Sequence, residues 1–261
     1  MLLYNNSMVH EIYKMKDKSD SFTKPKKGIF DLPMRLLILG KTGCGKSGLL
    51  GNMMLRDDFY RGDFLPENIF IFSGSVKGDM KLHQIIEQLE VPSSNVFDSY
   101  DEVAGNVIYD MLVDNYNEAV REKQKPEHSL IIFDDLGFSN LQRQNKKNDI
   151  MSRILCNGRK YLISTITLNQ RITQLSRTCR EQVSGAIIHK CSNKDLELVD
   201  ADFNYLKDKK KFKDMFREHT EGNHDFLVVN FSNGKKIYQN KSFQDICLCE
   251  GQKNECGGVK K

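Results

Sequence analysis

Short apolar runs alternate with longer amphipathic segments along most of the chain. The runs show little alternation of apolar and polar residues, and they cover residues 34–40, 68–74, 129–135, 161–167 and 185–190. Continuous apolar runs of this length are typical of strands that are buried on both faces of a parallel sheet. Helical patterns occur at residues 46–55, 79–89, 102–122 and 146–157. This order predicts an α/β fold with a mainly parallel central sheet flanked by helices.

The two ends of the chain differ from this pattern. Residues 1–33 contain many lysines and little periodicity, which favours a basic N-terminal arm or linker. Beyond a charged helical stretch at residues 207–217, two β-like runs flank Asn233-Gly234, a sequence that predicts a C-terminal β-hairpin. We therefore expect an arm over residues 1–33, one folded domain over 34–240, and a tail with cysteine, lysine and glycine over 241–261.

Composition narrows the class of protein only slightly. The 261 residues are 39% hydrophobic, which excludes a mostly disordered chain, and a net charge of +4 does not by itself indicate a nucleic-acid partner. No apolar run reaches the ~18 residues of a membrane span, so we expect no stable membrane insertion. Cys247, Cys249 and Cys256 lack the fourth ligand of an ordinary structural zinc site.

A phosphate-binding motif follows the first apolar run. It matches G-x-x-x-x-G-K-[ST] at every fixed position and consists of Gly40, Lys41, Thr42, Gly43, Cys44, Gly45, Lys46 and Ser47. Glycines let successive N–H groups point at phosphate oxygens, and the helix that follows adds the positive end of its dipole. We expect these residues and Gly48 to bind the phosphates of ATP. Lys46 would reach the β- and γ-phosphates, and the Ser47 hydroxyl would ligate Mg²⁺.

Two carboxylates end the apolar run at residues 129–135. The carboxyl ends of parallel strands are where ligands of open α/β sheets bind, so Asp134 is expected to hold Mg²⁺, partly through water. Asp135 is the expected base that polarises the attacking water. Glutamate is usual at this second position, and the shorter aspartate stands there in this chain.

Polar residues after the next run complete the candidate site. We expect the strand at residues 161–167 to lie between the phosphate loop and the acidic strand, so that Gln170 can sense the γ-phosphate, with Asn169 as the alternative. Arg180 is the first candidate for an arginine that acts in trans on a neighbouring subunit's nucleotide, and Arg177 is the second.

Other nucleotide-binding proteins share parts of this pattern. Residues 134–137 also match the DxxG of GTPases, but residues 193–196 place the acid of a guanine-reading NKxD one position early, which disfavours a GTPase. A nucleotide kinase or other phosphotransferase stays open, although residues 136–160 form no convincing arginine-rich lid. An ATP-dependent assembly factor that acts on capsid protein also stays open.

With these motifs in place, residues 34–240 resemble the viral DNA-packaging ATPases of the FtsK-HerA superfamily, in the poxvirus-type branch, and most resemble those of virophages. Arg180 falls on the family's arginine, while Gln182 stands where asparagine is usual. The resemblance implies a P-loop NTPase fold of the ASCE type and an ATPase motor that translocates double-stranded DNA into a capsid. It also implies a homo-oligomeric ring of five or six subunits, a capsid or portal-vertex partner, and a place at the viral factory in the host cytoplasm or in the virion. The lysines and the arginine between residues 207 and 217 leave two interpretations open. They contact DNA phosphates, or they form a solvated helix face without a ligand.

Overall fold

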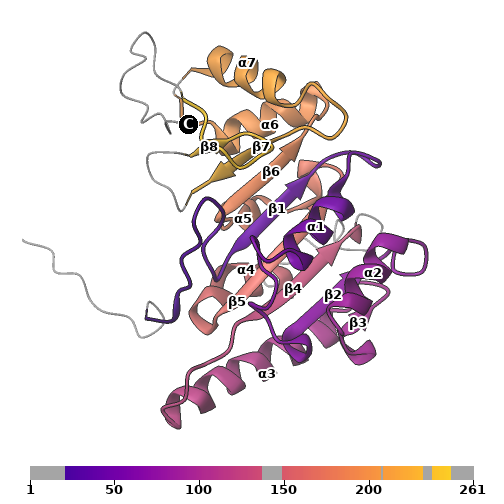
Figure 1. Ribbon diagram of the computed structural model, residues 1–261, viewed down its shortest axis with the longest axis vertical. Coiled ribbons are helices and arrows are strands. Elements are labelled where there is room, and N and C mark those ends of the chain that lie inside the picture. Colours follow the sequence, from indigo (N-terminus) through magenta and orange to yellow (C-terminus); the bar gives the residue numbers. More distant parts are fainter. Residues whose placement is uncertain (1–20, 137–148, 207, 232–236, 248–261) are drawn as a thin grey trace, which may run out of the picture.

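The computed structural model describes residues 21–136, 149–206, 208–231 and 237–247, and within them one mixed sheet forms the centre of the molecule (Figure 1). Its strand order is β3-β2-β4-β5-β1-β6-β7-β8. The strands are β1 (Arg35–Leu39), β2 (Ile69–Ser73), β3 (Val96–Phe97), β4 (Ser129–Asp134), β5 (Ile163–Asn169), β6 (Gly185–His189), β7 (Phe226–Asn230) and β8 (Tyr238–Gln239).

All pairings among β1 to β6 are parallel, as the apolar runs predict. β7 pairs antiparallel with β6, and β8 pairs antiparallel with β7, so the expected terminal hairpin is confirmed at the edge of the sheet. The expected turn at Asn233-Gly234 lies outside the described residues. β5 begins two residues later than the sequence pattern indicates, because residues 158–161 form a 3₁₀ turn and Leu162 adopts a left-handed φ of 58°.

Helices cover both faces of the sheet. They are α1 (Lys46–Leu55), α2 (Met80–Gln88), α3 (Glu102–Arg121), α4 (Ile150–Asn157), α5 (Arg177–Arg180), α6 (Asn193–Phe203) and α7 (Lys209–His219). α1 and α2 pack into one hydrophobic core, and α3 to α7 pack into a second core on the other face. Figure 1 shows α7 and the β7–β8 pair at one end of the sheet and α2, β3 and α3 at the other. None of the helices in the described part of the chain is long and apolar enough to cross a membrane.

Residues 21–34, which precede β1, are part of the folded domain. Phe30 and Leu32 are fully buried, and the Phe30 ring occupies space that a side chain at Gly185 would fill, since a Cβ there would lie 2.1 Å from the ring. The Tyr60 hydroxyl donates a hydrogen bond to Phe30 O (2.9 Å) and accepts one from Phe30 N (3.2 Å). The folded domain therefore begins before residue 34, earlier than the sequence pattern indicates.

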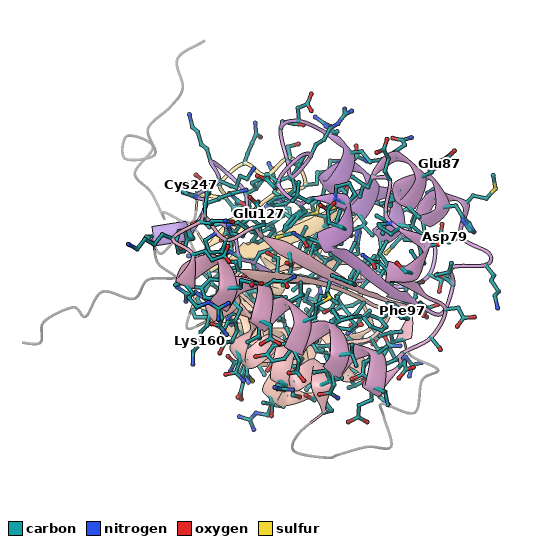
Figure 2. The ribbon with its side chains drawn as sticks, turned by 90° about the horizontal axis from the view of Figure 1, so that it is seen from below. Asp79, Glu87, Phe97, Glu127, Lys160 and Cys247 are labelled. Atoms are coloured by element: carbon teal, nitrogen blue, oxygen red, sulfur yellow. The ribbon has the colours of Figure 1, made fainter. Side chains whose placement is uncertain are left out.

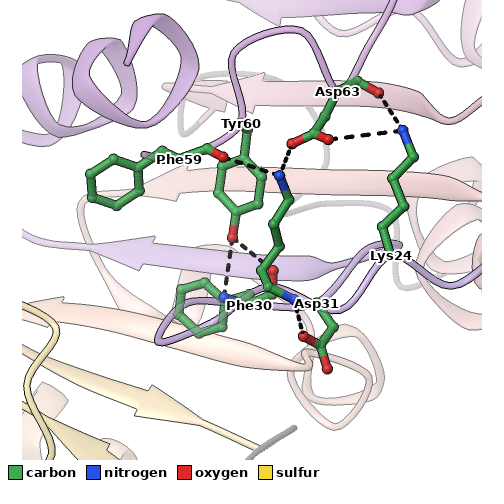
Figure 3. A network of polar contacts seen from close by, with 7 residues as sticks. Lys24, Phe30, Asp31, Phe59, Tyr60 and Asp63 are labelled. Carbon is green, nitrogen blue, oxygen red and sulfur yellow. Dashed lines mark hydrogen bonds and ion pairs between the residues drawn. The ribbon is translucent and has the colours of Figure 1, made fainter. Parts of the chain in front are cut away.

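Lysines of the same segment also hold it in place. Lys26 forms an ion pair with Asp63 and donates a hydrogen bond to Phe59 O (3.2 Å). Lys24 Nζ lies 3.8 Å from the other oxygen of the Asp63 carboxylate. Figure 3 shows both lysine side chains directed at Asp63. Two of the lysines that make residues 1–33 look like a free arm in the sequence are thus used in tertiary contacts.

The chain also continues to pack after residue 240. Phe243 meets the rings of Phe59 and Phe226 with centroid separations of 5.3 and 6.0 Å, and Ile246 N donates to Tyr238 O (2.9 Å). The described part of the expected tail, residues 241–247, is therefore packed against the domain.

Candidate active site

The strand order gathers the sequence motifs at one edge of the sheet. β5 lies between β1 and β4, so the residues that follow all three strands meet at their carboxyl ends. In Figure 2, Asp79 and Phe97 lie at this end of the sheet, and Lys160 lies at the opposite end. A pocket of about 270 Å³ opens there, lined by Thr42, Gly43, Gly45, Lys46, Ser47, Ser75, Asp79, Lys81, Asp134, Asp135, Leu168, Gln170 and His224.

The phosphate loop has a backbone that only glycine adopts readily. Gly43 and Gly45 have φ values of 82° and 105°, in the left-handed region, and Gly45 is the N-cap of α1. The first turn of α1 contains no acidic residue that would repel an anion. Lys46 Nζ donates hydrogen bonds to Gly40 O (2.6 Å) and Lys41 O (3.2 Å), which holds the ammonium over the loop. These features fit the phosphates of a nucleotide.

Asp134 is a buried carboxylate that two serines orient. Its Oδ2 accepts hydrogen bonds from Ser73 Oγ (2.8 Å) and Ser75 Oγ (3.0 Å). Burial raises the pKa of Asp134, the negative charges of Asp135 and Asp79 add to this rise, and the two serine hydrogen bonds oppose it. A carboxylate in this position would gain from a nearby cation.

Asp135 and Gln170 are in direct contact. Gln170 Nε2 donates a hydrogen bond to Asp135 Oδ1 (2.9 Å), and Gln174 Oε1 accepts from Gln170 N (2.7 Å), which fixes the start of this loop. Asp135 has a left-handed φ of 47°, a backbone conformation that costs energy for a side-chain-bearing residue. Asn169 is 7% exposed and does not line the pocket, so of the two candidates only Gln170 lies in the site.

Several pocket residues were not apparent in the sequence. Ser75 follows β2, and polar residues at the end of an apolar run are the only signal that pointed to it. Asp79 accepts a hydrogen bond from Ser47 Oγ (2.8 Å), a contact that depends on how α2 packs beside α1. His224, from the loop before β7, lies with its Nδ1 3.1 Å from Cys44 O.

The residues around Ser47 also fit a magnesium ion. The Ser47 hydroxyl and the carboxylates of Asp79 and Asp134 are hard oxygen donors, the type that Mg²⁺ prefers. Among the described residues no group of three or more His, Cys, Asp or Glu side chains could hold a metal by itself. Of the tail cysteines, Cys249 and Cys256 lie outside the described residues.

The two arginine candidates do not line this pocket. Arg180 Nε pairs with Asp202 (2.6 Å), its Nη1 donates to Leu175 O (2.8 Å), and its side chain is 11% exposed. The Arg177 side chain is 82% exposed and pairs with Glu181, the C-cap of the same short helix. Arg180 instead lines a cavity with Arg35 and Ser184, next to the amino ends of β1 and β6.

The sequence matches a known protein family over most of its length. The family described as Poxvirus A32 protein matches residues 22–255, which is most of the sequence. The chain belongs to this family. The family consists of poxvirus-type packaging ATPases, so the resemblance seen in the sequence motifs is confirmed at that level. The finer resemblance to virophage packaging ATPases stays a prediction.

Solved structures agree on the fold of this A32-family chain. The genome packaging NTPase B204 from Sulfolobus turreted icosahedral virus 2, in complex with AMP, is similar with a TM-score of 0.54 and 12% identity, over 79% of this chain and 96% of that one. The DNA-packaging ATPase B204 from Sulfolobus turreted icosahedral virus has a TM-score of 0.51 and 15% identity, over 80% and 97%. The pCW3 conjugation coupling protein TcpA has a TM-score of 0.52 and 15% identity, over 90% and 71%. No curated protein matches the chain in sequence.

Proposed function

We propose that this chain is a Mg²⁺-dependent ATPase motor that moves double-stranded viral DNA into a capsid. One observation carries the proposal beyond family membership: the Gln170 amide contacts Asp135 inside the same pocket that the phosphate loop lines. A γ-phosphate sensor in contact with a general base is an arrangement for hydrolysis by water, in which the sensor responds to the state of the nucleotide.

Nucleotide binding begins at the phosphate loop. The N–H groups from Gly43 to Gly48 and the N-terminal end of α1 would bind the phosphate oxygens of ATP, and Lys46 would neutralise charge on the β- and γ-phosphates. Lys46 already lies against the carbonyls of the loop, so little side-chain entropy remains to be lost when it exchanges a carbonyl for a phosphate oxygen.

Ser47 and Asp134 would hold Mg²⁺. The ion would neutralise charge on the β- and γ-phosphate oxygens. Ser73 and Ser75 fix the Asp134 carboxylate through hydrogen bonds to its Oδ2. Such outer hydrogen bonds orient ligating carboxylates and are often as important as the ligands themselves.

Asp135 would accept a proton from the attacking water. Its Oδ1 is occupied by the Gln170 hydrogen bond, which leaves the rest of the carboxylate to receive the proton. Gln170 follows β5 and so lies between the acidic strand and the phosphate loop, where a change at the γ-phosphate can move it and the base together.

Assembly into a ring would add an arginine to each site from the neighbouring subunit. Arg177 and Arg180 remain the two candidates for this role, and neither lines the pocket of its own chain. Arg180 would first have to leave Asp202, whereas Arg177 is largely exposed. Solved relatives in fold include a packaging ATPase and a conjugation coupling protein, which supports an assembly that acts on DNA.

DNA contact would involve the basic face of α7. Phe212 and Phe216 bury one side of this helix, while Lys209 and Lys210 are exposed on the other. Lys213 pairs with Glu197, so part of the basic stretch serves the fold. Exposed lysines can follow phosphates without reading sequence. The capsid or portal partner and the location at the viral factory or in the virion belong to the same proposal.

A strand-displacement assay tests the translocase directly. Wild-type protein with Mg²⁺ and ATP is expected to strip a third strand from a long DNA triplex, and the Asp135→Asn variant is expected to bind ATP without doing so. Phosphate transfer to a small acceptor without any effect of DNA would favour a phosphotransferase instead. Slow hydrolysis stimulated by capsid protein and not by DNA would favour the assembly factor.

A further inference from the structure

Asp79 joins the starts of two helices at the edge of the nucleotide pocket. Its Oδ1 accepts hydrogen bonds from Lys81 N (2.9 Å) and Leu82 N (3.2 Å), which makes it the N-cap of α2. Its Oδ2 accepts the hydroxyl hydrogen of Ser47 (2.8 Å), the second residue of α1. One oxygen of the Asp79 carboxylate therefore caps α2, and the other accepts the hydrogen bond of Ser47 at the end of the phosphate loop.

The direction of the Ser47 hydrogen bond has a chemical consequence. A serine hydroxyl has one hydrogen to donate and two lone pairs to offer. Because Asp79 takes the hydrogen, both lone pairs of Ser47 Oγ stay available to a hard cation in the pocket that Ser47 lines. A carboxylate behind a ligating group also raises that ligand's affinity for metal.

The charges around the pocket agree with such a role. Asp79 lines the pocket together with Asp134 and Asp135, and the cations that line it are Lys46 and Lys81. Three carboxylates thus face two ammonium groups in this pocket. A divalent cation bound there would offset the excess of negative charge.

We propose that Asp79 is a positioning residue for Mg²⁺: it orients the Ser47 hydroxyl for metal ligation and adds negative charge behind it. This inference rests on the proposed function, because it concerns the metal site of the same pocket. It adds a third carboxylate to the expected pair and assigns it to the start of α2, outside both sequence motifs.

The Asp79→Asn variant separates this role from helix capping. Asparagine is as good an N-cap as aspartate, so α2 should keep its cap. With Oδ1 used by the cap, however, the amide NH₂ would face Ser47 and donate to its oxygen. This occupies one of the two lone pairs, leaves the hydroxyl hydrogen without its acceptor, and removes the negative charge behind the ligand. Asp101→Asn is the matched control, because Asp101 caps α3 through the same two-bond pattern, to Val103 N (2.8 Å) and Ala104 N (3.2 Å), and does not line the pocket.

The measurement is the affinity for a fluorescent non-hydrolysable ATP analogue, titrated in Mg²⁺ and again in EDTA, with the melting temperature of each variant. For Asp79→Asn we expect the Mg²⁺ concentration that supports tight binding to rise about 10- to 100-fold. Its affinity in EDTA and its melting temperature should stay at the wild-type values. Asp101→Asn should leave all three quantities unchanged.

A double-mutant comparison tests whether Asp79 acts through the Ser47 hydroxyl. In a Ser47→Ala background the hydroxyl is absent, so Asp79→Asn should cause a much smaller further loss of Mg²⁺ dependence than it does in wild type. An unchanged Mg²⁺ requirement in Asp79→Asn, or an equal loss of affinity in Mg²⁺ and EDTA, would overturn the positioning role. If Asp79→Asn does not fold, Asp79→Ser retains a capping side chain without charge and is subject to the same criteria. Wild-type protein that binds the analogue without any Mg²⁺ dependence would instead overturn the proposed function itself.

Discussion

The side-chain amide of Gln170 donates a hydrogen bond to Asp135 Oδ1 at 2.9 Å, and this contact links the two strands that carry the candidate chemistry. Asp135 follows β4 and Gln170 follows β5, and these strands are neighbours in the sheet. The carboxylate that would take a proton from water is thus held by the residue that would sense the γ-phosphate.

The base assignment is tested by replacing Asp135 with asparagine. The amide has nearly the shape of the carboxylate but cannot take a proton, so nucleotide affinity should stay within about threefold while kcat falls at least about 10²-fold. Equilibrium nucleotide binding and steady-state hydrolysis measure the two quantities. Normal turnover in Asp135→Asn would remove this residue from the catalytic role.

The contact between sensor and base is tested by Gln170→Glu. This change places a second carboxylate next to Asp135, and the repulsion between like charges raises the pKa of the pair. The base would then be deprotonated only at higher pH, so the acid limb of the kcat–pH profile should shift upward relative to wild type. Gln170→Leu serves as the uncharged comparison, with a lower kcat but no such shift. An acid limb at the wild-type pH in Gln170→Glu would mean that the contact plays no part in turnover.

The phosphate loop is tested by Lys46→Ala, with Lys160→Ala as the control at the opposite end of the sheet (Figure 2). Loss of the ammonium that lies over the loop should abolish nucleotide binding or lower hydrolysis by about 10²- to 10³-fold. Lys160 is exposed, and its removal should change neither quantity. Equal activity of the two variants would contradict the assignment of Lys46.

The two arginine candidates should give different signatures. Arg180→Ala leaves Asp202 without its ion-pair partner, at a cost of about 2 kcal/mol, which should lower the melting temperature by ~4–8 °C. Arg177 is exposed, so Arg177→Ala should leave the melting temperature unchanged.

The residue that acts in trans should restore hydrolysis when its alanine variant is mixed with Lys46→Ala subunits. Failure of both mixtures would contradict catalysis in trans by either arginine.

The buried side chain of His189 should make the free energy of unfolding depend on pH. His189 is 1% exposed beneath the phosphate loop, and burial, together with the nearby charges of Lys46 and His224, lowers its pKa to about 4. The unfolded chain, with a pKa near ~6.5, therefore binds more protons than the folded chain between about pH 6.5 and pH 4. The free energy of unfolding should fall as the pH drops through this window, with a contribution from this group of up to about 1.4 kcal/mol per pH unit.

Denaturant unfolding at pH 7 and pH 5 measures this effect in wild type and in His189→Asn. The variant loses packing against the ring of Phe226 and should be less stable at both pH values, but the difference between the two values should shrink. His128 has a pKa that burial also lowers, and it contributes equally to both proteins. An unchanged pH dependence in His189→Asn would contradict the assignment to His189.

The sequence predicts those features of the fold and of the site that consecutive residues encode. The phosphate loop and the β4 carboxylates are encoded in consecutive residues, and the ordering of apolar runs predicts the parallel sheet. The burial of Phe30 depends on the absence of a side chain at Gly185, far away in the chain, and the local lysines point to an arm instead. The Ser47–Asp79 contact and the pairing of Arg180 with Asp202 likewise exist only after the helices have packed, so no motif could have indicated them.

Steady-state ATP hydrolysis is the sharpest test of the proposal that this A32-family chain is an ATP-driven ring motor that acts on DNA. The rate per subunit should be measured across a series of protein concentrations, with and without long double-stranded DNA at low salt. We expect a steep rise with both protein and DNA, because in the proposed ring each site would gain an arginine from its neighbour and assembly would occur on the DNA. A rate per subunit that is indifferent to both would contradict the translocase.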